Sequence, residues 1–157
     1  MLLNPIRSVL TEMLGWRLER TRADDMHCTK LGVAPHVIAN TLAYMCETRA
    51  YRVFPPVADH VLSAAASWQD MLRDYELRFK KWLRQHKLSC SCHYWTTKAI
   101  KRENNTEYPT YRCKAAQSPI IVAFLAELSL EFSQRAPSHE ANLVSACTWG
   151  LAQYFLC

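Results

Sequence analysis

Seven apolar residues recur at alternating steps of four and three along one segment of this 157-residue chain: Val61, Ala65, Trp68, Leu72, Tyr75, Phe79 and Trp82. An α-helix has about 3.6 residues per turn, so this spacing places all of them on one stripe, the geometry of helix-on-helix packing. We predict a helix that starts near Pro56 and runs to about Lys87. The aromatic members of the stripe are expected to be buried core anchors rather than a binding surface.

Four other segments carry the helical period, and each has a helix-start signal. They run from Asn4 to about Leu18, from Pro35 to about Arg49, from Ser118 to about Phe132, and from Pro137 to the end of the chain. Asparagine and serine cap helices, and proline is favoured in the first turn. Residues 26–33 are expected to be a connector. Only 3 glycines in the whole chain argue against a turn-rich all-β fold. We therefore predict an all-α domain over residues 1–157, with about five helices in a bundle-like arrangement.

The helical period is lost over residues 88–117. Threonine, asparagine and proline are frequent there, which favours loop structure. Two short pieces, residues 94–97 and 110–113, can pair as a small hairpin, and irregular structure throughout is the alternative. We therefore expect a basic, mostly irregular segment between the third and fourth helices.

The seven cysteines favour a reducing compartment. Their number is odd, and Cys46 and Cys147 lie within helical patterns. Reduced thiols in an intracellular protein, cytoplasmic or nuclear, are therefore preferred to a disulfide scaffold. No stretch approaches the roughly 20 apolar residues of a membrane-spanning helix, so we expect no membrane association. The chain ends on four apolar residues, 154–157, without a cap. This ending is typical either of a fragment of a larger protein or of a docked terminal helix, and both remain open.

The positive charge is concentrated in about one quarter of the chain. Residues 73–114 carry 11 lysines and arginines against 4 acidic residues, a net charge of +7, whereas the rest of the chain carries −2. Cations neutralise phosphates and interleaved aromatic side chains can stack on bases, so this segment favours nucleic acid as a partner. A solvated helix end followed by a charged loop is the alternative. The predicted contact set is Arg78, Lys80, Lys81, Arg84, Lys87, Lys98, Lys101 and Arg102.

One cluster of residues has the chemistry of a zinc site: Cys90, Cys92, His93 and Cys113. Thiolates and an imidazole are the ligands of tetrahedral zinc, which can also order an irregular segment. The Cys-x-Cys-His spacing is tighter than that of most such sites, and only one cysteine lies on the far side. His86 could replace His93 as a ligand. Ordinary reduced cysteines beside a basic loop are the alternative, and no other cofactor is expected.

The chain carries no catalytic motif. A glycine-rich phosphate loop, a Gly-x-Ser-x-Gly elbow and a His-Glu-x-x-His pair are all missing from the sequence. The crowded residues 24–28 are better explained as a polar loop after a helix, so no catalytic residue is predicted. The sequence favours a non-catalytic, nucleic-acid-associated helical domain. The alternative is a protein-interaction or scaffold module that packs another chain through the stripe from Val61 to Trp82.

Overall fold

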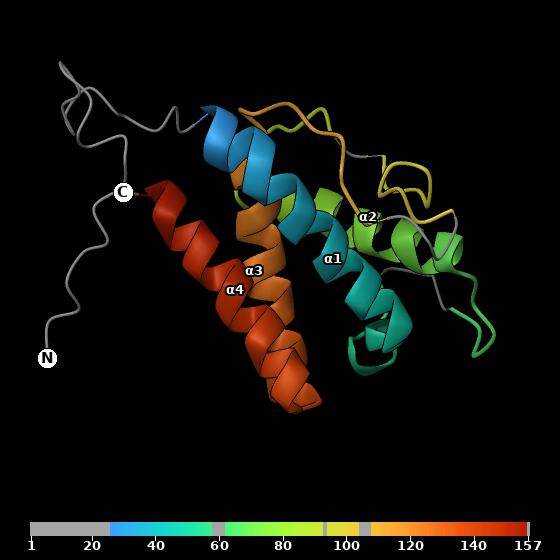
Figure 1. The fold of residues 1–157 in the computed structure, drawn as a ribbon. Helices are drawn as coiled ribbons and strands as arrows, with labels where there is room; N and C mark the ends of the chain where they lie inside the picture. Colours follow the sequence, from blue (N-terminus) through green and yellow to red (C-terminus); the bar gives the residue numbers. More distant parts are fainter. Residues whose placement is uncertain (1–25, 58–61, 93, 104–107, 157) are drawn as a thin grey trace, which may run out of the picture.

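The computed structural model describes residues 26–57, 62–92, 94–103 and 108–156 (Figure 1). Within these ranges every long regular element is a helix: α1 (Ala34–Glu47), α2 (Trp68–Gln85), α3 (Ser118–Arg135) and α4 (His139–Leu156). A π-helical segment, Met26–Val33, leads directly into α1, and a short 3₁₀ turn, Ala50–Val53, follows it. None of the described helices is both long enough and apolar enough to cross a membrane.

The helices pack as an antiparallel pair with two further helices laid against it. α3 and α4 lie side by side, and α1 crosses them (Figure 1). α2 contacts both α1 and α3. Inside the α3–α4 interface, the buried hydroxyls of Ser129 and Thr148 lie 2.7 Å apart and form a hydrogen bond. The packed, all-helical arrangement predicted from the sequence is therefore confirmed for the described part of the chain.

Three of the five predicted helices are found close to their predicted bounds, as α1, α3 and α4. The predicted helix from Asn4 to about Leu18 lies outside the described residues, so a count of five is not confirmed. The connector predicted for residues 26–33 is wrong, because this stretch continues into α1 as a π-helix.

The predicted start of the long helix near Pro56 is also wrong, since α2 begins at Trp68. Ser67 fixes this start through a capping box with Asp70. The Ser67 Oγ accepts a hydrogen bond from the Asp70 N–H at 3.2 Å, and the Ser67 N–H donates to Asp70 Oδ2 at 3.0 Å. These two bonds satisfy backbone donors that a helix leaves unpaired at its first turn. Ala65, assigned to the stripe, is consequently exposed and outside the helix, and Val61 lies outside the described residues.

The C-terminal part of the predicted stripe, which lies in α2, packs into the core. Leu72, Tyr75 and Phe79 are completely buried, Trp82 is nearly so, and Trp68 is half-buried. The prediction that the aromatic residues of α2 are core anchors is therefore confirmed, with Trp68 at the edge of the core.

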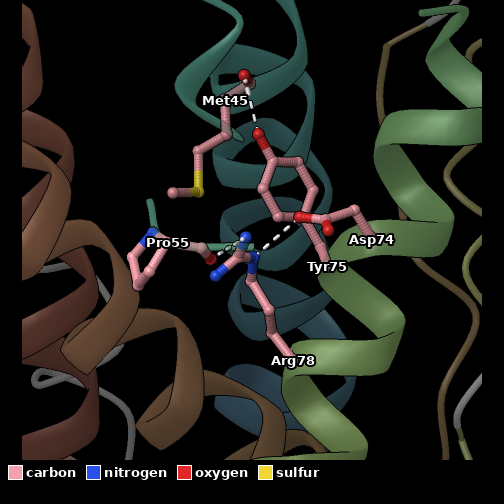
Figure 2. A network of polar contacts seen from close by, with 5 residues as sticks. All are labelled: Met45, Pro55, Asp74, Tyr75 and Arg78. Atoms are coloured by element: carbon pink, nitrogen blue, oxygen red, sulfur yellow. Dashed lines mark hydrogen bonds and ion pairs between the residues drawn. The ribbon is translucent and has the colours of Figure 1, made fainter. Parts of the chain in front are cut away.

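A polar network joins α2 to the end of α1 and to the Phe54–Pro56 segment (Figure 2). Arg78 donates from Nε to Asp74 Oδ2 at 2.7 Å and from Nη2 to the Pro55 carbonyl at 3.0 Å. The Tyr75 hydroxyl donates to the Met45 carbonyl at 3.1 Å. Asp74 is only 2% exposed, so its carboxylate depends on Arg78 for charge compensation.

We predict that Arg78→Met lowers the free energy of unfolding by about 2–3 kcal/mol, because it leaves a buried carboxylate without its partner. Urea denaturation followed by circular dichroism measures this change. Arg84→Met is the matched control, since Arg84 lies on the same helix but is exposed. Its effect is expected to be below about 0.5 kcal/mol. Equal losses in the two variants would contradict a structural role for the Asp74–Arg78 pair.

Candidate nucleic-acid interface

The irregular segment between α2 and α3 is anchored in the core by Trp95. This side chain is completely buried. Its ring stacks on Phe79 of α2 with a centroid separation of 5.2 Å and lies 5.8 Å from the ring of Phe124 on α3. Such aromatic contacts add to the stabilisation given by burial alone. The backbone on either side of Trp95 is therefore held against the helices although it has no regular structure.

A tight turn follows Trp95 and presents two lysines to solvent. Gln69 of α2 holds its start, donating to the Trp95 carbonyl and accepting from the Thr97 N–H, each at 3.4 Å. Ile100 is completely buried, whereas Lys98 and Lys101 are exposed. The buried isoleucine and the Gln69 contacts fix which side of the turn faces outward.

Residues 108–114 run extended beside this turn, with side chains that alternate between solvent and core. Pro109 and Tyr111 are buried, whereas Tyr108, Arg112 and Lys114 are exposed. Successive side chains of an extended chain point to opposite sides, which produces this alternation. Even without a regular strand, the segment therefore has an inner and an outer face.

The small hairpin considered as an alternative for residues 94–97 and 110–113 is not formed, since neither piece is a strand in the described structure. The extended segment instead bonds to two other places. The Thr110 N–H donates to the Ile100 carbonyl at 3.1 Å, and the Tyr111 N–H donates to the Pro35 carbonyl of α1 at 3.0 Å. The segment is thus fixed between the lysine turn and the start of α1.

The turn and the extended segment together enclose a cleft of about 610 Å³, which we call the basic cleft: Lys98, Lys101, Glu103, Tyr108, Thr110 and Arg112. The described residues that line it include three cations and one carboxylate. Tyr108 is 84% exposed at its wall, so its ring is open to a ligand. Cations that line a concave surface raise the local concentration of anions, and this arrangement is suited to holding phosphate.

The structure divides the predicted contact set. Lys98 and Lys101 lie together in the basic cleft. Three members are already engaged within the fold: Arg78 with Asp74 and Pro55, Lys80 with Glu76, and Arg102 with Glu47. The Arg102 guanidinium also lies 5.9 Å from the centre of the Trp68 ring. These three cations are therefore less available to a partner than the sequence suggested.

The remaining members, Lys81, Arg84 and Lys87, are exposed at the end of α2. They do not line the basic cleft. Lys81 lies instead in a separate groove of about 200 Å³ that includes Trp82 and Glu131. The structure thus separates a helix-end group of cations from the cleft group.

Two cleft residues, Tyr108 and Arg112, were missed from the predicted contact set. Both were recognised in the sequence as part of the basic, aromatic-rich segment, but nothing there joined them to Lys98 and Lys101. A signal was present, because residues 108–114 alternate between candidate outward and inward side chains. That period of two identifies which side chains face outward, but it does not show that they lie beside the turn that carries Lys98 and Lys101.

The three cysteines proposed as zinc ligands, Cys90, Cys92 and Cys113, lie near one another. Cys92 and Cys113 line one cavity of about 510 Å³. The Cys90 sulfur lies 3.8 Å from the Cys92 carbonyl oxygen. Among the described residues, no three histidines, cysteines or acids are arranged to hold a metal ion. His93 lies outside the described residues, so the four-ligand set remains a prediction.

His86, the alternative ligand, has a different environment. It is the residue that ends α2, and its ring packs 4.4 Å from the ring of Trp82. This contact accounts for the position of the histidine without a metal.

Comparisons with protein-family models, with curated proteins and with solved structures each found no match to this chain. The functional argument therefore rests on the geometry and charge of the basic cleft.

Burial, with the neighbouring Cys92 and Cys90 adding to it, raises the pKa of the Cys113 thiol to about 12. Because the thiolate is the reactive form, we predict that Cys113 is alkylated by iodoacetamide at pH 8 far more slowly than the exposed Cys147. Its rate should rise about tenfold per pH unit between pH 8 and 10. Peptide mass spectrometry resolves the two sites, and urea-unfolded protein is the control. Equal rates in the folded protein would contradict the burial of Cys113.

The same shift affects stability. The pKa of Cys113 is higher in the folded chain than its ordinary value of 9.0, so its burial stabilises the fold below about pH 9. That contribution is expected to be lost as the pH rises from about 9 towards 12.

Proposed function

We propose that this chain is a non-catalytic helical domain that binds nucleic acid through the basic cleft. One observation supports the proposal: Lys98, Lys101 and Arg112 line the same cleft as the exposed Tyr108, and Glu103 is the acidic side chain among the described residues that line it. No family likeness contributes to it. The five described cysteines are all free thiols, which supports an intracellular location, cytoplasmic or nuclear.

The cations of the cleft would neutralise phosphates. Arg112 has a planar guanidinium that can bond two phosphate oxygens at once, whereas Lys98 and Lys101 act as point charges. Contacts of this kind position a nucleic acid without reading its sequence. The helix-end cations Lys81, Arg84 and Lys87 would add a long-range attraction that guides the approach.

The double variant Lys98→Gln/Arg112→Gln tests this assignment. We expect it to weaken binding of short DNA and RNA roughly tenfold at low salt and to reduce the slope of log affinity against log salt by about 1–2, because two phosphate contacts are removed. Fluorescence anisotropy titrations at several salt concentrations measure both quantities.

The matched control is Lys81→Gln/Arg84→Gln, which removes the same charge from exposed positions at the end of α2. We expect it to change the affinity less than threefold. An equal loss of affinity in the two double variants would show that binding depends on the overall charge of the chain and not on the cleft. Absence of binding at low salt, or binding that high salt leaves unchanged, would reject the proposal.

A second candidate is a protein-interaction module, but through a surface other than the predicted stripe. Tyr75, Phe79 and Trp82 are buried inside this chain. The outer face of α4 is apolar instead, with exposed Leu143 and Trp149. A groove of about 300 Å³ between α1 and α4, lined in part by Leu143, Val144 and Cys147, continues this face. Exposed apolar side chains beside an apolar groove are a feature of interaction sites.

Sedimentation velocity at several concentrations tests the second candidate for self-association. We expect an apparent mass that rises with concentration in the unmodified chain and rises less in Trp149→Gln, because that change removes about half-exposed aromatic surface from the face of α4. Gln153→Ala is the control on the same helix. A monomer at every concentration would count against self-association through α4.

A further inference from the structure

We propose that the basic cleft takes single-stranded nucleic acid, with a base stacked on Tyr108 and its flanking phosphates on Lys98 and Arg112. This inference rests on the proposed function and narrows it to one class of nucleic acid. It is argued from the shape of the cleft, the exposure of Tyr108 and the placement of the charges.

The shape of the cleft favours a single strand. Its volume of about 610 Å³ lies in the range of roughly 300–1,000 Å³ that is usual for sites holding one small molecule or one nucleotide unit. A duplex keeps its bases stacked inside and offers its phosphates on a convex surface. It would therefore touch only the rim of the cleft, whereas a single strand can place a nucleotide within it.

Tyr108 places an exposed aromatic ring in the cleft, a feature that binding of phosphate alone does not require. Its ring is 84% exposed although the neighbouring Pro109 and Tyr111 are buried. An exposed aromatic ring beside cations is the combination used to bind single strands, because every unpaired base has a face that can stack. In a duplex those faces are already covered by neighbouring bases.

The backbone around Tyr108 is held in place on its C-terminal side. The His36 Nδ1 lies 3.3 Å from the Pro109 carbonyl oxygen and 3.2 Å from the Thr110 hydroxyl. The Tyr111 hydroxyl donates to the Cys92 carbonyl at 3.3 Å. A base stacked on Tyr108 would thus meet a wall that is anchored to α1 and to the core, at a fixed distance from Arg112.

Substitution of Glu103 offers a second, independent test of the same site. Among the described residues that line the cleft, Glu103 is the acidic one, and a carboxylate repels the phosphates that Lys98, Lys101 and Arg112 attract. Glu103→Gln is therefore expected to tighten binding of a single strand by about threefold, in the opposite direction to the lysine and arginine variants.

The test compares a fluorescently labelled twelve-nucleotide oligothymidine with a labelled duplex of the same length by anisotropy. We expect the full-length chain to bind the single strand about tenfold more tightly. Tyr108→Ala should reduce single-strand affinity about tenfold and leave duplex affinity unchanged, because only the unpaired bases stack. Tyr108→Phe keeps the ring and should retain the affinity of the unmodified chain. Thymidine monophosphate serves as a competitor.

The outcomes separate this inference from the proposed function. Equal or tighter binding of the duplex, or an equal effect of Tyr108→Ala on both ligands, would overturn the single-strand assignment but leave phosphate binding in place. Competition by thymidine monophosphate as strong as that of the oligonucleotide, at equal nucleotide concentration, would overturn it in favour of a free-nucleotide site. Failure to bind either nucleic acid at low salt would overturn both the inference and the proposed function.

Discussion

Burial of Trp95 between Phe79 and Phe124 is the contact on which the rest of the candidate site depends. The segment that contains it has no helix or strand, and the local hydrogen bonds of the turn after Trp95, such as Arg102 N–H to the Thr97 carbonyl at 2.8 Å, do not connect it to the helices. Full burial of an indole contributes on the order of 2–3 kcal/mol, enough to hold a loop against the helices. Because the lysine turn begins just after Trp95, this single side chain sets where the cations at Lys98 and Lys101 stand relative to α1 and α2.

Charge in this chain has two uses, and net charge does not distinguish them. Arg78 compensates a buried carboxylate and ties α2 to Pro55, while Arg102 pairs with Glu47 and covers Trp68. These cations belong to the fold. Lys98, Lys101 and Arg112 line a cleft in which Glu103 is the acidic side chain among the described lining residues. The proposed function therefore rests on the excess of positive charge among the described residues of that cleft, which is smaller and more local than the +7 of the whole segment.

The sequence allowed α1, α3 and α4 to be predicted because a proline in the first turn or just before it marks the start of each clear apolar period. It misplaced the start of α2 because the apolar spacing continues upstream of Ser67, where the capping box overrides it. The cleft itself was beyond sequence reasoning. The Tyr111–Pro35 backbone bond fixes one wall to α1, and the packing of Trp95 on Phe124 fixes the start of the other wall to α3. Both are contacts between residues far apart in the chain. No local period reports such pairings.

Because side chains alternate between two faces along residues 108–114, the number of residues in this segment is more constrained than the identity of its outward-facing residues. Deleting or inserting one residue there would exchange the two faces, moving Arg112 towards the core and Tyr111 towards solvent. Replacing an outward side chain, by contrast, leaves the inner anchors in place. Substitutions at the outward positions can therefore change the proposed ligand preference while the length of residues 108–114 stays the same. We expect related chains to differ in the residue types at these positions but not in the number of residues in the segment.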